Sequence, residues 1–206
     1  TTIDLSQLDP RLQDDRIEVA CDVDNPLTGP RGASSIYGPQ KGADEQEIKK
    51  LDQNLKHFSE VIQQDLGLNI ENESGAGAAG GVGAAMLAFL GAELRKGGDL
   101  IVEMLALEDT IKTADFVITG EGGMNHQTIF GKAPIIVAKI AKKYNIPVIA
   151  LVGSISEGYE EVYKHGIDAV FSILPEVTDL EEALNNAYRN IERTAYNVAE
   201  VLEIDL

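Results

Sequence analysis

Two aspartates near the start of the chain have the type and spacing that suit phosphate chemistry. Asp22 and Asp24 alternate directly after a short run of β-formers, so on a continuing strand they would share one face. Carboxylates at the carboxyl end of a strand suit the coordination of Mg²⁺ or the activation of a hydroxyl group. We predict that both aspartates are metal ligands and that Asp24 is also catalytic. The alternative is an Asx-turn in a solvated loop.

The loop that contains these aspartates, residues 21–43, also carries basic side chains. Arg31 and Lys41 are suited to contact a phosphate group or the carboxylate of a substrate. The length of the loop and its glycine-containing turns favour a functional loop over a simple connection. We predict a catalytic contact for Lys41.

A second polar cluster follows an apolar run in residues 118–134, ITGEGGMNHQTIFGKAP. Its glycines permit close approach of a ligand to the backbone, Glu121 supplies a carboxylate, and Lys132 stands just before a predicted helix. The segment lacks the G-x-x-x-x-G-K-[ST] pattern of a Walker A loop. We predict that Glu121 is catalytic. The residues of this cluster that are predicted to bind a cofactor are Gly120, Gly122, Gln127 and Lys132.

The next apolar run ends in a similar way, in LVGSISEG at residues 151–158. The carboxyl ends of parallel strands meet at one edge of a sheet. We therefore expect Gly153 and Ser154 to lie beside the 120–128 loop and to bind the cofactor with it. For Ser154, a simple helix cap is the alternative.

A third glycine-rich stretch, ESGAGAAGGVGAAM at residues 73–86, has the spacing G-x-G-x-x-G at Gly75, Gly77 and Gly80. A dinucleotide fingerprint must follow a strand, but the preceding residues are polar and turn-like, which disfavours that interpretation. Close helix packing and an anion site at residues 74–77 are both compatible with the small side chains. Gly75 and Gly77 are predicted as cofactor-binding residues on the second interpretation.

The elements that must position these residues change character along the chain. The first part contains a strand at 16–23, a helix at 43–67, a small-residue helix at 76–91 and one or two short helices in 97–114. Buried strands then alternate with helices, which implies a parallel sheet with helices on its faces. The strands are expected at 115–120, 147–153 and 168–173, and the helices at 133–145, 157–166 and 179–202. We expect two modules, 1–112 and 113–206, of which the second is doubly wound α/β.

Composition excludes several classes of function. A net charge of −17 over 206 residues argues against a nucleic acid or an anionic membrane surface as the main partner. It also implies that any bound phosphate is met by amides, a few basic groups or a divalent cation. The single cysteine, Cys21, fits a reducing compartment, and no run is long and apolar enough to predict a membrane span. We expect a cytoplasmic protein.

Several long motifs together resemble the glycerate kinases of the bacterial glycerate 2-kinase type. They are ACDVDNPLTGPRGASSIYGPQKGA, ESGAGAAGGVGAAM, ITGEG followed by QTIFGKAP, and VIALVGS. The resemblance implies transfer of the γ-phosphoryl group of ATP, with Mg²⁺, to D-glycerate. It also implies two α/β domains, with 113–206 in a flavodoxin-like domain, 1–112 in a smaller α/β module, and a cleft between them.

The resemblance has two departures. Family chains are longer and carry N-terminal motifs that are absent here, so this chain resembles the C-terminal half, and we expect it to need the N-terminal half as a partner and to be inactive alone. The family's TGEGR-x-D reads TGEGGMN, with Gly123 in place of arginine and Asn125 in place of aspartate. The alternatives are an inactive homologue that binds a small anion or a partner and, more weakly supported, a dehydrogenase. A homo-oligomer is also compatible with the sequence.

Overall fold

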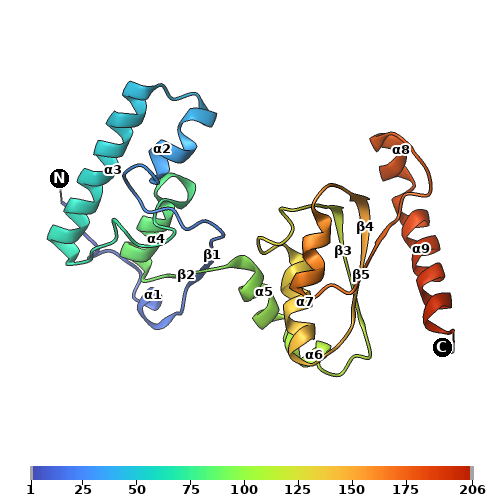
Figure 1. Ribbon diagram of the computed structural model, residues 1–206. Coiled ribbons are helices and arrows are strands. Elements are labelled where there is room, and N and C mark those ends of the chain that lie inside the picture. The colour runs from blue at the N-terminus through green and yellow to red at the C-terminus, as the bar shows by residue number, and fades with distance from the viewer. Residues whose placement is uncertain (1, 205–206) are drawn as a thin grey trace. The chain divides into compact units, whose positions relative to one another are not determined.

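Two units make up the chain, Thr1–Leu100 and Ile101–Leu206, which we call the N-terminal and C-terminal units. The structure is a computed structural model that describes residues 2–204, with only the backbone for residue 13 (Figure 1). Both units are mixed α/β, as predicted, and each has a parallel sheet, which the sequence predicted for the second unit. The division lies inside helix α5 (Gly97–Met104), whereas the sequence pattern changes near 112. No helix among the described residues has the length and apolar character needed to cross a membrane.

The N-terminal unit has a two-stranded parallel sheet with helices around it. Its elements before α5 are α1 (Arg11–Asp14), β1 (Glu18–Ala20), α2 (Ala33–Tyr37), η1 (Pro39–Lys41), α3 (Glu45–Leu66), η2 (Ala78–Gly80), α4 (Val82–Leu90) and β2 (Glu93–Arg95). β1 is shorter than the predicted strand, and its partner β2 was missed by sequence analysis. The predicted small-residue helix is split, because the 3₁₀ turn η2 precedes α4.

Helix α3 confirms the prediction for 43–67, and local signals fix both its ends. The Asp44 side chain accepts hydrogen bonds from two first-turn amides, and Glu47 completes a capping box. Gly67 ends the helix in the left-handed conformation that glycine tolerates best. The buried Ile62 of α3 joins Leu27 in the core of this unit, so the helix holds one end of the polar 21–43 loop.

The C-terminal unit has a three-stranded sheet of order β3-β4-β5, in which all neighbours are parallel. Its elements after α5 are α6 (Leu107–Ile111), β3 (Val117–Met124), α7 (Ala133–Lys143), β4 (Val148–Ile155), η3 (Tyr159–His165), β5 (Ala169–Ser172), α8 (Leu180–Asn185) and α9 (Ala187–Leu202). The predicted alternation of strands and helices is confirmed. A tight turn joins antiparallel strands, whereas two parallel neighbours need a longer crossover connection, which is usually a helix.

The two faces of this sheet have different covers. Val148, Ala150 and Val152 alternate along β4 and belong to the core that α7 builds with Ile135 and Ala138. α9 also contacts β4, and its residues lie beside Phe171 of β5 on the other side of the sheet. α7 and α9 therefore cover opposite faces (Figure 1). By register, Val117, Thr119 and Glu121 of β3 lie on the α7 face, whereas Ile118 and Gly120 lie on the α9 face.

Three sequence expectations for this unit were wrong in detail. Both β3 and β4 continue beyond their predicted ends at Gly120 and Gly153, so Gly122 and Ser154, which we expected to lie in loops, are strand residues. The predicted helix at 157–166 is the 3₁₀ helix η3. The long final helix is interrupted at Asn186, whose backbone (φ −96°, ψ 3°) separates α8 from α9.

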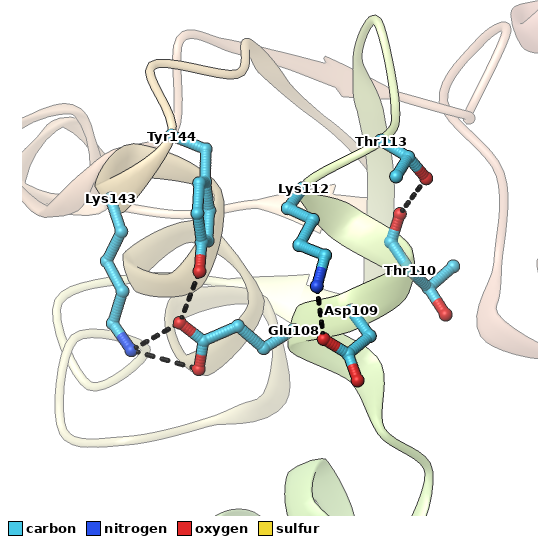
Figure 2. Close-up of polar contacts among 7 residues, drawn as sticks. All are labelled: Glu108, Asp109, Thr110, Lys112, Thr113, Lys143 and Tyr144. Atoms are coloured by element: carbon cyan, nitrogen blue, oxygen red, sulfur yellow. Dashed lines mark hydrogen bonds and ion pairs between the residues drawn. The ribbon is translucent and has the colours of Figure 1, made fainter.

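A polar cluster fastens α6 to the end of α7 (Figure 2). Glu108 accepts hydrogen bonds from Lys143 Nζ at 3.0 Å and from the Tyr144 hydroxyl at 2.9 Å. These bonds lower the pKa of Glu108, and the same carboxylate raises the pKa of Tyr144. Because the groups are exposed and far along α7 from Lys132, we assign the cluster a structural role.

Asp168 ties together α7, β4 and the start of β5. Its carboxylate accepts from Lys142 Nζ at 2.7 Å and from the Val148 amide at 2.7 Å. Burial raises the pKa of Asp168, but these two hydrogen bonds outweigh it, so the pKa lies below its ordinary value. The carboxylate therefore stabilises the fold above its unfolded pKa of about 3.9, and the contribution is lost as pH falls through the lower folded pKa.

We expect Asp168→Asn to lower the free energy of unfolding by about 1 kcal/mol near neutral pH, a modest value because both partners are partly exposed. The difference from wild type should persist down to about pH 4 and shrink below it. Urea denaturation across this range measures it, with the exposed Asp115→Asn as the matched control. A difference that stays constant below about pH 3 would contradict a role for the ionised carboxylate.

Candidate functional site

An ion pair joins two of the residues that the sequence singled out. Glu121 lies on the α7 face of β3, and Lys132 immediately precedes the first residue of α7. Lys132 Nζ lies 2.8 Å from Glu121 Oε1. The side chains are 22% exposed for Glu121 and 40% for Lys132, so the pair is only partly shielded from water. The fold thus places a carboxylate and an ammonium group together near the carboxyl end of a parallel strand, where open α/β sheets bind ligands.

The second oxygen of this carboxylate has no partner. Glu121 Oε2 is buried and, among the described residues, is the one buried side-chain oxygen or nitrogen without a hydrogen bond. Leaving a buried charged oxygen unsatisfied is costly, so such an atom calls for an explanation. A cation or a hydrogen-bond donor from a ligand would satisfy it.

The chain between β3 and α7 is held by a turn. The Asn125 side chain accepts from the Gln127 amide at 2.8 Å, and the Asn125 amide donates to Thr128 Oγ1 at 3.2 Å. Thr128 is fully buried, whereas the predicted cofactor residue Gln127 is exposed. The turn therefore anchors the loop through Thr128 and leaves Gln127 facing solvent.

Strand pairing brings the predicted glycines and Ser154 together. Gly123 pairs with Ser154 across β3 and β4, which confirms that the two segments lie side by side. Ser154 is inside β4, so it is not a helix cap. A Cβ added at Gly120 would lie 2.7 Å from the Leu151 carbonyl oxygen, and one at Gly153 would lie 2.3 Å from that of Gly122.

Gly122 differs from these two glycines. A Cβ added there would meet no atom within 4 Å, and the residue is exposed. Packing between strands therefore explains Gly120 and Gly153, but it does not explain Gly122. An open backbone at this position is available for the approach of a ligand.

The two aspartates of the N-terminal unit are not on a strand, because β1 ends at Ala20. Asp22 Oδ1 accepts from the Gly97 amide at 2.9 Å, and Asp24 Oδ2 forms an exposed ion pair with Arg31 at 3.0 Å. Within residues 2–204 no three histidine, cysteine or acidic side chains are grouped to hold a metal ion. Arg31, which the sequence assigned to a phosphate or carboxylate, thus already has one carboxylate partner.

The loop around Asp24 is held by side chains that sequence analysis did not single out. Asn25 donates to the Arg31 carbonyl oxygen at 2.8 Å and accepts from the Tyr37 hydroxyl at 2.6 Å. Thr28 donates to Glu71 at 2.6 Å. The sequence showed that NPLTGPRG is polar, but it did not show its hydrogen-bond partners, of which Glu71 lies 43 residues from Thr28. Lys41 is exposed at the end of η1.

Packing accounts for the first two glycines of the G-x-G-x-x-G stretch, whereas the third, Gly80, has open space around it and a positive φ of 75°. Gly75 and Gly77 are buried, and a Cβ at Gly77 would lie 2.3 Å from the Pro26 carbonyl oxygen. The amides of Ala76 and Gly77 donate to backbone carbonyls, so they are not free to bind an anion. The element directly before the stretch is the helix α3 and not a strand, in agreement with the sequence argument against a dinucleotide site.

A hollow of about 360 Å³ lies elsewhere in the C-terminal unit, between β5 and α9. It is lined by Phe171, Ser172, Ile173, Leu174, Arg193, Thr194, Asn197, Val198 and Val201. None of these is a predicted site residue. The candidate site is therefore defined by the ends of β3 and β4 and not by this hollow.

Comparison with known proteins gives a consistent result. The Glycerate kinase family matches residues 1–203. Glycerate 2-kinase of Escherichia coli is 52% identical over 99% of this chain and 54% of its own length, and a glycerate kinase of Halalkalibacterium halodurans is 50% identical over 97% and 52%. A crystal structure from Salmonella typhimurium LT2, provisionally assigned as glycerate kinase 2, has a TM-score of 0.85 at 48% identity, over 98% of this chain and 52% of that one. The chain spans about half the length of the relatives it matches.

Proposed function

Because this chain belongs to the glycerate kinase family, we propose that it forms about half of a cytoplasmic enzyme that transfers the γ-phosphoryl group of ATP to D-glycerate. The missing half of the active protein is the part that the relatives have outside the matched region. The observation that carries the proposal is the Glu121–Lys132 pair, with one buried carboxylate oxygen left without a partner.

Lys132 is the residue we assign to the phosphates of ATP. Phosphoryl transfer depends on positioning and on neutralising the charge of the transferred group. In a protein with a net charge of −17, a lysine held at the start of α7 beside Glu121 supplies a local positive charge. Its ion pair with Glu121 holds the ammonium group in place, while its partial exposure leaves donors for a phosphate oxygen.

Glu121 fits the Mg²⁺ that such a reaction requires. Mg²⁺ is commonly held by one or two carboxylates together with substrate phosphates, so a cluster of three acidic residues is not needed. The unpartnered Oε2 is an oxygen of the kind that Mg²⁺ prefers. When bound, the ion would neutralise charge on the β- and γ-phosphates. The backbone at Gly122 and the Ser154 hydroxyl are the neighbouring groups that we assign to the nucleotide.

The N-terminal unit is assigned to the hydroxy acid. Arg31 and Lys41 are exposed cations suited to a carboxylate, and Asp24 is an exposed carboxylate suited to a hydroxyl or a metal. The hydrogen bonds of Asn25 and Thr28 order this loop in the absence of a ligand. Less conformational entropy is then lost when a ligand binds. The packing roles of Gly75 and Gly77 leave them outside the proposed site.

The test is an assay of ADP release by the intact gene product with ATP and Mg²⁺. We expect release that depends on D-glycerate and that is much slower with L-glycerate or without an acceptor. Release that is the same with and without D-glycerate would overturn the proposal. Intact mass must be compared with the open reading frame first, because the 206-residue chain by itself is expected to be inactive.

A non-catalytic homologue is the second candidate, and the residues Gly123 and Asn125 favour it. If they weaken catalysis, the double variant Gly123→Arg, Asn125→Asp should raise kcat/KM about tenfold by adding a charged hydrogen bond to phosphate. Both changes fit the structure. A Cβ at Gly123 would lie 3.1 Å from the rotatable Ser154 hydroxyl, and aspartate keeps the acceptor that binds the Gln127 amide. An unchanged rate in the ADP assay would show that both positions are peripheral.

A further inference from the structure

The hollow between β5 and α9 has a size that suits a small organic ligand. Its volume is about 360 Å³, and ligand pockets measure roughly 300–1,000 Å³. Ile173 and Val198, which are 7% and 4% exposed, form part of its apolar wall. Phe171 adds an aromatic ring that is 38% exposed, so this wall is partly open to water. The hollow therefore offers apolar surface to the body of a ligand.

The hollow also contains a cation without a counter-charge. Arg193 of α9 lines it, and none of the described residues that line it is acidic, in a chain with 34 aspartates and glutamates. Arg193 and Arg189 have no carboxylate partner within residues 2–204, whereas the other four arginines form ion pairs. Those four are Arg11, Arg16, Arg31 and Arg95. The charge of the hollow thus favours an anionic ligand, and the planar guanidinium group matches a carboxylate.

Two polar side chains of α9 accompany Arg193. Thr194 and Asn197 also line the hollow, and neither side chain forms a hydrogen bond within the described part of the chain. Asn197 comes four residues after Arg193 on the same helix, so these two side chains are neighbours. Ser172 is different, because its hydroxyl donates to the Gly153 carbonyl oxygen at 3.2 Å and accepts from the Leu174 amide at 3.2 Å. The polar side chains that remain for a ligand are therefore all on α9.

We infer that this hollow binds a small carboxylate with an apolar body, at a second site that is separate from the proposed reaction. Arg193 pairs with the carboxylate, Thr194 and Asn197 donate hydrogen bonds to it, and Phe171 and Val198 contact the apolar body. Inorganic phosphate is a poorer ligand, because five of the nine lining residues are apolar and phosphate would leave them in contact with water. The inference does not depend on the proposed function.

Titration of the intact gene product with benzoate, followed by ligand-observed NMR, tests the inference. Benzoate joins a carboxylate to an apolar ring. We expect saturable binding with a Kd of about 1 mM or tighter, unchanged by saturating ATP and D-glycerate. Benzamide keeps the ring without the charge and should bind at least about tenfold more weakly. Acetate keeps the charge without the ring and should also bind at least about tenfold more weakly.

Two variants of α9 locate the site. Arg193→Gln removes the charge in the hollow and should weaken the binding of benzoate at least about tenfold. The matched control is Arg189→Gln, which changes the other arginine without a carboxylate partner, at a position that does not line the hollow. It should leave the Kd within about twofold of wild type. Both side chains are exposed, so both variants are expected to fold.

Failure of benzoate to bind the intact wild-type protein would overturn the inference. Displacement of benzoate by D-glycerate would overturn it as well, because it would place benzoate in the acceptor site. Equal Kd values for the two variants would mean that Arg193 does not hold the carboxylate, and benzamide or acetate binding as tightly as benzoate would contradict the proposed class of ligand. None of these measurements needs turnover, so a protein that binds benzoate but releases no ADP would remove the kinase proposal alone.

Discussion

Replacing Lys132 with methionine is expected to lower kcat/KM for phosphoryl transfer to D-glycerate by about 10²–10³-fold in the intact gene product. This is the usual loss when one fixed group that stabilises developing charge is removed from an active site. The substitution keeps most of the apolar stem and removes the ammonium group that lies 2.8 Å from Glu121. The ADP-release assay measures the change.

The matched control is Lys143→Met, at the other end of the same helix. Lys143 also has a glutamate partner, Glu108, at 3.0 Å, but that pair lies in the structural cluster of Figure 2. Its loss should leave kcat/KM within about twofold of wild type, as for surface ion pairs that contribute little. Equal losses in the two variants would mean that Lys132 acts through stability and not on the phosphates.

Two glycine substitutions should separate folding from ligand binding at the same strand ends. Gly153→Ala is expected to lower the free energy of unfolding by about 1–3 kcal/mol, because its Cβ would lie 2.3 Å from a backbone oxygen. Gly122→Ala meets no atom within 4 Å and should change stability by less than about 0.5 kcal/mol. Instead it should raise KM for ATP about tenfold, since a methyl group obstructs the approach of the nucleotide.

Urea denaturation and the ADP assay on both variants supply the two readouts. If Gly122→Ala keeps the wild-type KM for ATP, the open backbone at this position is not a nucleotide contact. If Gly153→Ala is as stable as wild type, the backbone at the ends of β3 and β4 moves to accommodate the added methyl group without a cost in stability.

Local sequence signals predicted the main helix of the N-terminal unit and the sheet of the C-terminal unit. The helical spacing of the apolar residues in 43–67 and the stop at Gly67 were sufficient to predict α3, and the alternation of apolar strands with helices was sufficient to predict the parallel order of the second sheet. These signals succeed because each acts within a few residues. The three residues of β2 were missed because so short a strand is defined by its neighbour β1 and not by its own pattern.

The site was only partly predictable, for a related reason. The strands were predicted to end at Gly120 and Gly153, yet β3 continues to Met124 and β4 to Ile155, because pairing with a neighbouring strand overrides local preference. The closeness of Glu121 and Lys132 depends on the helix that follows the strand, and no spacing rule specifies it. Asp22 and Asp24 failed to share a strand face because pairing with β2 ends before them.

The most direct test of the central claim is labelling with an acyl-phosphate derivative of ATP, which acylates lysines that lie beside the nucleotide's phosphates. With the intact gene product, we expect Lys132 to be the acylated residue, with free ATP suppressing the reaction and with Lys142 and Lys143 of the same helix unlabelled. Labelling that ATP suppresses at other lysines, with Lys132 unmodified, would show that the phosphates bind elsewhere and would contradict the assignment.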